Sequence, residues 1–245
     1  MNSPVICPDH PGLTNDPGHF LNFIDRNCVP YTYLELFLFA GGCFLWVAAY
    51  AVLIRNSLRY RFMDMAAIAV CSNFAWEGIW SWAFKTDMGW FLVCTYRAWF
   101  FLDIFIFWQL LRWGSKQISQ PAFRDHFKPA AVFIALGFTV LYYFYVQEGM
   151  DTPIGANSAY LAQIIVSSTC LLLLLGSPDA KILSLAVAWL KGTGTGMNTV
   201  MMLMHYPHNH FLHTLGILAF ILDTTYIGYL LRLKAAEASA KPRMA

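Results

Sequence analysis

Apolar residues in this chain are grouped into seven long blocks, which are separated by short and more polar segments. The blocks cover residues 34–54, 65–84, 92–111, 129–147, 159–175, 182–204 and 212–231. A helix needs about 20 predominantly apolar residues to cross the hydrocarbon core of a bilayer. The pattern therefore predicts an all-α membrane protein with seven transmembrane helices, packed as a single domain over residues 34–234.

The two flanking segments differ from this domain. Residues 1–33 contain five prolines, which interrupt any long helix, and they lack the cationic leader and short apolar run of a cleaved signal peptide. We expect them to form an irregular non-cytoplasmic segment. Residues 235–245 are small and polar, so we expect a disordered cytoplasmic tail.

The distribution of Lys and Arg between the blocks predicts the orientation, because cytoplasmic loops of membrane proteins carry an excess of these residues. One side of the predicted bundle has Arg55, Arg59, Arg61, Arg112, Lys116, Arg124, Lys128, Lys181, Arg232, Lys234, Lys241 and Arg243. The other side has only Arg26 and Lys85 outside the blocks. This predicts an N-terminus outside or in a lumen and a cytoplasmic C-terminus. The host membrane would be the endoplasmic reticulum in a fungus and the plasma membrane in a bacterium.

Composition excludes some classes of partner. Hydrophobic residues make up 58% of the chain and charged residues only 12%, against about 25% charged residues in a typical soluble domain. The net charge of +2 comes from the predicted cytoplasmic flanks, so we expect contact with membrane lipids and no nucleic-acid partner. No obligatory protein partner is predicted.

Cysteines and glycines suggest local contacts. Cys7 and Cys28 share the non-cytoplasmic segment, where they either form a disulfide or remain free. The other cysteines fall in or beside the blocks and fit small packing positions. Gly192 and Gly196 have the GxxxG spacing, which permits close contact between helices in a membrane.

Five charged residues lie inside the blocks: Glu77, Arg97, Asp103, Lys191 and Asp223. A carboxylate near the middle of a membrane helix costs on the order of 3 kcal/mol to insert. These charges could simply pair to fix helix packing, with Lys191 neutralising Asp223 or Asp103, while Arg97 reaches the nearby interface. Three acids against two bases nevertheless leave at least one carboxyl unpaired or protonated, and a protonated buried carboxyl can act as an acid.

Polar and aromatic side chains accompany the three acids at helical spacing. Asn73 lies one turn before Glu77, Trp76 and Trp80 flank Glu77, Trp99 lies one turn before Asp103, and Tyr226 follows Asp223. An aromatic face stabilises a desolvated cation by about 2 kcal/mol. An acid surrounded by such rings suits chemistry that passes through a carbocation.

Several known motifs are absent from the sequence. It has no aspartate-rich diphosphate-binding run, no Asp-x-Asp-Asp acid motif, no lysine in the last block for a retinal, and no HExxH or GxSxG. A loop with four histidines, His205, His208, His210 and His213, could bind a metal, but no carboxylate or cysteine accompanies it. We interpret it as a solvated loop and expect neither a metal nor a cofactor.

The order of these short motifs resembles the integral-membrane terpene cyclases of meroterpenoid and indole-diterpene biosynthesis. The matching residues are Asn73, Trp76, Glu77, Trp99, Asp103, Asp223 and Tyr226. The resemblance implies that Glu77 and Asp223 are catalytic acids. It also implies protonation of a terminal epoxide or olefin on a lipophilic prenylated substrate, followed by cyclisation through carbocations. The long N-terminal segment, the histidine loop and Lys191 have no counterpart that we can match.

The residues themselves fit a non-metal reaction started by a general acid. We predict Glu77 or Asp223 as the proton donor, the other acid positioning it, and Asp103 as a further catalytic member of the network. The predicted substrate-binding residues are Asn73, Trp76, Trp80, Trp99, Tyr226 and Lys191.

Two other functions fit parts of the sequence. A small-solute or proton-coupled transporter would also carry intramembrane acids and Lys191. A sterol-isomerase-like lipid isomerase would also protonate an olefin, but it would move a double bond and form no ring. A closed aromatic pocket around the acids would favour the enzymes, whereas a polar channel open to both sides would favour the transporter.

Overall fold

The computed structural model describes residues 31–86, 88, 90–176 and 182–240. Within these residues the chain forms seven α-helices and two short 3₁₀ helices. They are α1 (Tyr33–Tyr60), α2 (Ala67–Trp82), α3 (Trp90–Trp113), η2 (Gly114–Gln117), η3 (Pro121–His126), α4 (Phe127–Gln147), α5 (Ala156–Gly176), α6 (Leu185–His205) and α7 (His210–Ala240). The Cys7–Cys28 pair, nearly all of the predicted N-terminal segment and Lys181 lie outside the described residues.

Local sequence explains where the helices begin. Thr32 and Glu35 form a capping box at α1, in which Thr32 Oγ1 accepts from the Glu35 amide at 3.2 Å and Glu35 accepts from the Thr32 amide at 2.5 Å. Ser184 caps α6 by accepting from the Val187 amide at 3.3 Å. Gly155, with a φ of 75°, precedes α5 at a point where a Cβ would lie 2.4 Å from the Trp80 ring.

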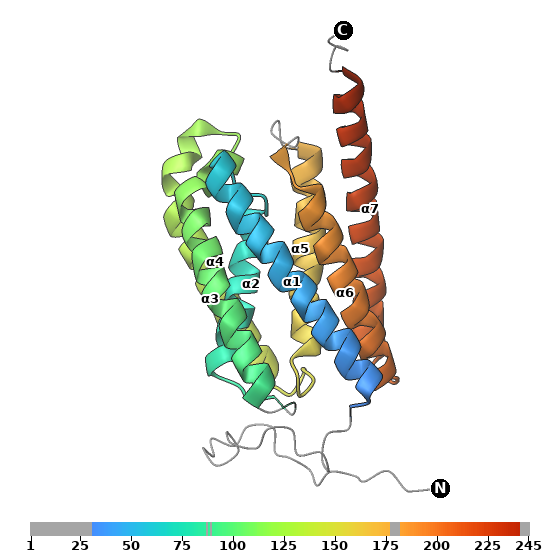
Figure 1. The fold of residues 1–245 in the computed structure, drawn as a ribbon. Coiled ribbons are helices and arrows are strands. Elements are labelled where there is room, and N and C mark those ends of the chain that lie inside the picture. The colour runs from blue at the N-terminus through green and yellow to red at the C-terminus, as the bar shows by residue number, and fades with distance from the viewer. Residues whose placement is uncertain (1–30, 87, 89, 177–181, 241–245) are drawn as a thin grey trace, which may run out of the picture.

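Each apolar block contains one α-helix, and the main differences from the prediction are at two C-terminal ends. α1 continues to Tyr60, and α7 continues to Ala240 and projects beyond the other helices (Figure 1). Residues 235–240 are therefore helical, where the sequence predicted a disordered tail.

Four helices in the described part of the chain are long and apolar enough to cross a membrane. They are Tyr33–Tyr60, Pro121–Gln147, Ala156–Gly176 and His210–Ser239. α2 has 16 residues, fewer than the roughly 20 that a span perpendicular to the bilayer needs. The number of crossings therefore stays a prediction.

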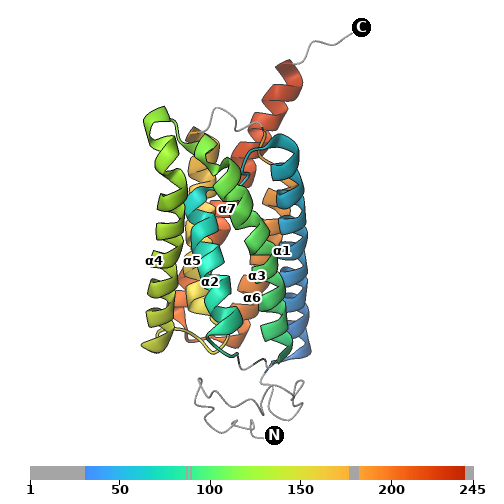
Figure 2. The same cartoon turned by 90° about the vertical axis from the view of Figure 1, so that its left-hand side faces the viewer.

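Six helices form a ring around the centre of the bundle. Going round it, α1 packs against α6, α6 against α7, α7 against α5, α5 against α2, α2 against α3, and α3 against α1. α4 lies outside this ring and packs mainly on α2, at the edge of the bundle (Figure 2). α2 is thus covered on both sides, which places its polar residues in the interior.

The close contact between α1 and α6 depends on one glycine from each helix. A Cβ on Gly42 would lie 2.8 Å from the Gly194 carbonyl oxygen, and a Cβ on Gly194 would lie 2.9 Å from the Gly42 carbonyl oxygen. Gly192 faces Asp223 and Ile227 of α7, and a Cβ on Gly196 would meet no atom within 4 Å. Gly192 of the GxxxG pair therefore lies close to α7, while the contact with α1 uses Gly194, which lies between Gly192 and Gly196.

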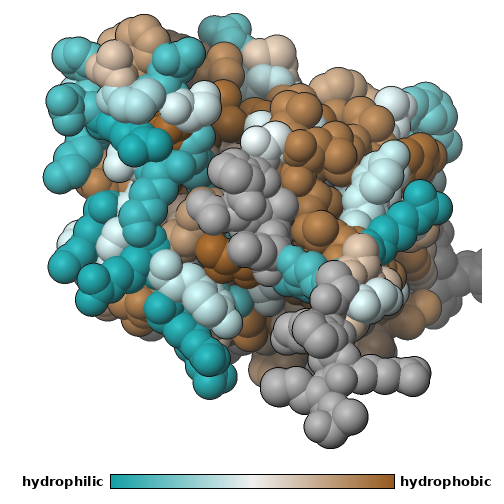
Figure 3. Space-filling model, turned by 90° about the horizontal axis from the view of Figure 1, so that it is seen from above, coloured by the Kyte–Doolittle hydropathy of each residue, from teal (hydrophilic) through white to brown (hydrophobic). Residues whose placement is uncertain are grey.

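The described basic residues of the predicted cytoplasmic loops lie at one end of the bundle. Seen from this end, hydrophilic residues gather on the side where α3 and α4 are joined (Figure 3). Arg97 lies toward the other end, where its guanidinium group is 4.5 Å from the centroid of the Trp82 ring and Nε donates to the Ser81 carbonyl at 3.1 Å. This separation fits the predicted alternation of helix directions, whereas the orientation relative to a membrane stays a prediction.

Candidate active site

A cavity lies between α1, α2, α3, α5, α6 and the segment before α5. The space not filled by atoms is about 690 Å³, including its open mouth. Its lining residues are Phe39, Trp46, Tyr50, Asn73, Trp76, Glu77, Tyr96, Trp99, Ile154, Ala156, Ala159, Tyr160, Gln163, Thr195, Asn198 and Met202. The lining is rich in aromatic rings, and Glu77 is the one acidic or basic residue among these lining residues.

Glu77 is held by one of its two carboxyl oxygens. The residue is only 2% exposed. Oε1 accepts hydrogen bonds from the Tyr50 hydroxyl at 2.8 Å and from Asn73 Nδ2 at 3.0 Å, while Oε2 has no partner among the described residues. Glu77 therefore lines the cavity with Oε1 oriented by Tyr50 and Asn73, and its carboxyl also interacts with that of Asp103.

Asn73 connects Glu77 to Asp103. Its Nδ2 donates to Asp103 Oδ2 at 3.0 Å and also contacts the Tyr50 hydroxyl. A side-chain amide nitrogen carries two hydrogens, so the contacts to Glu77, Asp103 and Tyr50 must share them. Asp103 is buried behind Asn73 and does not line the cavity. Within the described part of the chain, no basic side chain pairs with Glu77 or Asp103.

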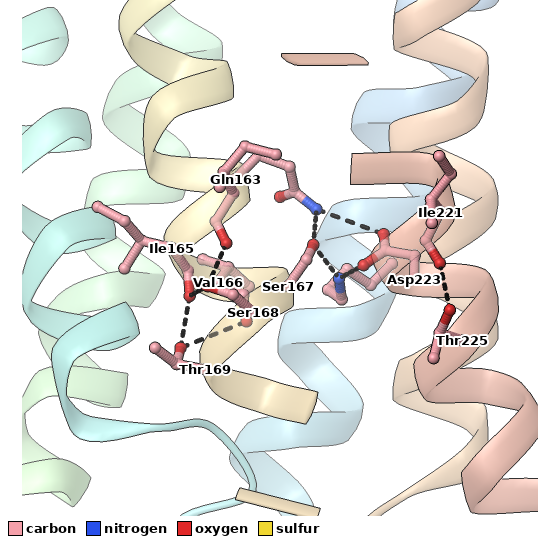
Figure 4. Close-up of polar contacts among 11 residues, drawn as sticks. Gln163, Ile165, Val166, Ser167, Ser168, Thr169, Ile221, Asp223 and Thr225 are labelled. Carbon is pink, nitrogen blue, oxygen red and sulfur yellow. Dashed lines mark hydrogen bonds and ion pairs between the residues drawn. The ribbon is translucent and has the colours of Figure 1, made fainter. Parts of the chain in front are cut away.

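Asp223 lies in a separate polar cluster. Its Oδ1 forms a buried ion pair with Lys191 Nζ, which also donates to Ser167 Oγ at 3.0 Å. Figure 4 shows Asp223 on α7 facing Ser167 and Gln163 on α5. Of the two pairings that the sequence left open for Lys191, the structure contains the one with Asp223. Asp223 does not line the cavity.

Gln163 joins this ion pair to the cavity. The residue lines the cavity, and its Nε2 donates to Ser167 Oγ at 3.0 Å and to Asp223 Oδ2 at 3.4 Å (Figure 4). The charge of Asp223 therefore reaches the cavity only through an amide. Gln163 and Ser167 are one helical turn apart on α5, a spacing that by itself connects them to neither acid.

The structure brings half of the predicted substrate-binding residues to the cavity. Asn73, Trp76 and Trp99 line it. Trp80 is buried beside Trp76, with ring centroids 6.3 Å apart, and is not part of the lining. Tyr226 and Lys191 instead line a second, smaller cavity, together with Asp64 and Cys170 among others. Direct contact of Trp80, Tyr226 and Lys191 with a molecule in the main cavity is not supported by their positions.

Sequence reasoning missed several lining residues, including Tyr50, Tyr96, Tyr160, Thr195 and Asn198. Tyr50 lies inside the apolar block 34–54, away from the interfaces where membrane tyrosines usually gather, whereas Tyr160 is only the second residue of its block. The position of Tyr50 was an available signal. The Oγ1 of Thr195 and the Nε1 of Trp99 are buried without a hydrogen-bond partner among the described residues, so they are free to bind a polar group.

The histidine loop is not arranged around one point. His205 stacks on Tyr31, with ring centroids 3.9 Å apart, and its Nδ1 lies 3.4 Å from Glu35 Oε1. His213 Nε2 instead lies 2.9 Å from the Tyr206 carbonyl oxygen. Among the described residues, no three His, Cys, Asp or Glu side chains are grouped so that they could hold a metal ion.

Comparisons with known proteins identify the family of the chain. Residues 25–236 match the family model of the Pyr4-like transmembrane terpene cyclases. The chain is also similar to the Pyr4-family terpene cyclase mfmH of Annulohypoxylon moriforme, at 31% identity over 102 residues. That alignment covers 40% of each of the two chains. No solved structure matches the chain.

The family match extends over the whole helical bundle, from before α1 to within α7. It confirms the resemblance seen in the sequence, and together with the apolar helices it makes this a membrane protein. The chain belongs to the Pyr4-like transmembrane terpene cyclases.

Proposed function

We propose that this protein is a terpene cyclase in which Glu77 donates a proton to the terminal epoxide or olefin of a polyprenyl chain on a meroterpenoid-type substrate. The observation that carries the proposal is the environment of Glu77 Oε2. This oxygen has no hydrogen-bond donor among the described residues, and Glu77 belongs to the lining of a cavity that is rich in aromatic rings. All seven α-helices cross the membrane in this proposal, with the N-terminus outside or in a lumen.

The acid network can supply a proton. Two carboxyls in one buried cluster, joined through Asn73 and without a basic partner among the described residues, cannot both ionise without a large cost. A proton shared in this cluster is therefore retained in the interior. General acid catalysis of this kind contributes about 10² to 10⁴-fold to a rate.

The reaction conserves all atoms of the substrate. The proton moves from Glu77 Oε2 to the epoxide oxygen, the C–O bond breaks, and the alkene π electrons attack the electron-deficient carbon to close a ring. The last cation then loses a proton to a carboxylate of the cluster or to water, which restores the acid. With an olefin as the starting group, protonation occurs at carbon and the later steps are the same.

The aromatic lining supports the cationic stages. Trp46, Trp76, Trp99 and Tyr96 present rings to the cavity, and cation–π contact is worth about 2 kcal/mol where water is excluded. Exclusion of water also protects the cation from premature capture. A lipophilic substrate would reach such a site from the bilayer.

Asp223 has an indirect role in this proposal. The resemblance implies that it is a catalytic acid, but it is ion-paired with Lys191 and lies outside the cavity. We assign Glu77 as the donor and Asp223 as a positioning residue that acts through Gln163.

The proposal is tested with membranes that contain wild type or Glu77→Gln, incubated with an epoxyfarnesyl aromatic compound. Wild type should form a cyclic product of unchanged mass, and Glu77→Gln should form at least about 100-fold less at equal amounts of folded protein. Glu148→Gln changes an exposed acid of the α4–α5 segment and is the matched control. Cyclisation by Glu77→Gln at the wild-type rate would exclude Glu77 as the donor. Movement of a solute across vesicles without product formation would favour a transporter.

A further inference from the structure

The segment between α4 and α5 carries an acid that the proposed mechanism does not use. Asp151 Oδ1 accepts from the backbone amides of Thr152 at 2.8 Å, Asn157 at 2.9 Å and Ser158 at 3.3 Å. The amides of Asn157 and Ser158 lie in the first turn of α5, where a negative charge is favourable. Asp151 is therefore fixed in place at the start of this helix.

The second oxygen of Asp151 orients Ser158. Asp151 Oδ2 accepts a hydrogen bond from the Ser158 hydroxyl, and Ser158 is fully buried. A serine hydroxyl has one hydrogen and two lone pairs. Because the carboxylate takes the hydrogen, the Ser158 oxygen is left as an acceptor for its other neighbours.

The strongest donor to that oxygen is a cavity residue. Trp76 Nε1 donates to Ser158 Oγ at 2.7 Å, and Trp80 Nε1 lies 3.4 Å away from the same oxygen. Trp76 lines the cavity and is adjacent to Glu77 on α2. Its ring also meets the Tyr96 ring edge-on, at 5.2 Å between centroids and 77° between planes. The hydrogen bond and this contact together fix the plane of the indole.

We propose that Asp151 and Ser158 are positioning residues that hold the Trp76 indole in the orientation needed to stabilise a cationic intermediate. The inference rests on the proposed cyclase function and adds a determinant of product specificity. A hydrogen-bond chain from indole to hydroxyl to carboxylate polarises each member. It therefore places a negative charge behind the N–H edge of the ring and makes the ring face a better partner for a cation.

This arrangement predicts an effect on the course of the reaction after protonation. Glu77 Oε1 accepts hydrogen bonds from Tyr50 and Asn73, neither of which belongs to this chain, so loss of the chain leaves these contacts of the proton donor in place. A Trp76 ring that is free to tilt stabilises the intermediate less. Incompletely cyclised or water-captured products should then increase at the expense of the normal product, while substrate is still consumed.

The experiment compares Ser158→Ala, Asp151→Asn and Trp76→Phe with wild type in membranes supplied with the epoxyfarnesyl aromatic compound. For Ser158→Ala and Asp151→Asn we expect substrate consumption within about twofold of wild type and a ratio of normal to aberrant products about fivefold lower, the equivalent of about 1 kcal/mol of lost cation stabilisation. Trp76→Phe changes a ring of the cavity itself and should lower this ratio at least as far. The double variant Trp76→Phe/Ser158→Ala should shift the ratio no further than Trp76→Phe alone, because without the indole N–H the Ser158 hydroxyl no longer holds this ring.

Thr152→Val is the matched structural control. Thr152 Oγ1 accepts from the Ala156 amide at 2.7 Å, so this variant loosens the same helix start without touching Trp76. Its product ratio should stay that of wild type even where its melting temperature falls as far as that of Ser158→Ala. Equal shifts in the control and in Ser158→Ala, or unchanged ratios in all variants, would overturn the inference while the cyclase function stands. Absence of any cyclic product from wild type would instead overturn the proposed function and this inference with it.

Discussion

Gln163 and Asp223 are joined by a hydrogen bond of 3.4 Å from Nε2 to Oδ2, although Gln163 lines the aromatic cavity and Asp223 does not. The other Asp223 oxygen is paired with Lys191, and both residues are almost fully buried. Loss of activity on mutation of Asp223 could therefore reflect either lost chemistry or an unpaired lysine in the interior. The two causes make different predictions for paired substitutions.

The first prediction concerns this ion pair. Removing one partner of a buried pair costs about 3–5 kcal/mol, whereas replacing both with apolar residues of similar size is often close to neutral. We expect Asp223→Asn to lower the melting temperature in detergent strongly and Lys191→Met/Asp223→Leu to restore most of it. Per folded molecule, the double variant should cyclise substrate no more than about tenfold more slowly than wild type, a loss of about 1.4 kcal/mol. A double variant that is stable but inactive would return Asp223 to the role of a catalytic acid.

The second prediction concerns the hydroxyl that holds Glu77. Tyr50→Phe removes the donor to Glu77 Oε1 and keeps the ring, so it should reduce kcat about fivefold with little change in KM, as expected for one hydrogen bond of about 1 kcal/mol. Tyr142→Phe is the control. It removes an equally buried hydroxyl that bonds Ser72 at 2.6 Å, on the side of α2 that faces α4. Equal losses in both variants would mean that Tyr50 contributes only to packing.

The acid cluster illustrates which part of the site the sequence could predict. Asn73 and Glu77 are one helical turn apart, so their contact follows from helix geometry alone. Tyr50 comes from another helix, 27 residues earlier, and its position depends on how α1 is rotated against α2. Lys191 had two acids as candidate partners, and the rotations of α6 and α7 about their axes place it beside Asp223. Periodicity predicted the helices well, but it contains no information about these rotations.

The same limit applies to the glycines and to the end of α7. GxxxG spacing identifies a surface that can pack closely, yet Gly194 rather than Gly192 and Gly196 meets α1. We expected the residues after 234 to be disordered, but alanine and glutamate favour helix, and α7 continues through them to Ala240.

The third prediction tests the α1–α6 contact. Gly42→Ala would bring a Cβ to 2.1 Å from Asn198 Oδ1 and 2.8 Å from the Gly194 carbonyl oxygen. Overpacking of this kind typically costs about 1–3 kcal/mol. Because Asn198 lines the cavity, product formation should fall together with the melting temperature. Gly196→Ala is the matched control, since a Cβ there meets no atom within 4 Å and alanine favours helix by up to about 1 kcal/mol. Destabilisation by Gly196→Ala and tolerance of Gly42→Ala would contradict the observed register.

The last prediction concerns Asp64, which lies in the segment between α1 and α2. Burial raises the pKa of this carboxyl from 3.8 to about 7. Three contacts oppose this shift only in part: hydrogen bonds from the Ser184 amide and the Asn56 side chain, and the charge of Lys234. The folded state therefore binds a proton that the unfolded state releases, so the contribution of Asp64 to stability falls as pH rises from about 4 to 7.

Asp64→Asn keeps an oxygen to accept from the Ser184 amide but cannot ionise. Its gain in stability over wild type should be larger at pH 8 than at pH 5 by about 2–3 kcal/mol, because each pKa unit corresponds to about 1.4 kcal/mol. Thermal unfolding in detergent at both pH values measures this difference. Asp125→Asn, at an exposed acid of η3, should show no such change with pH. An equal gain for Asp64→Asn at both pH values would mean that Asp64 is charged at both. Its negative charge would then be stabilised by Lys234 or by Lys191, which lines the same small cavity.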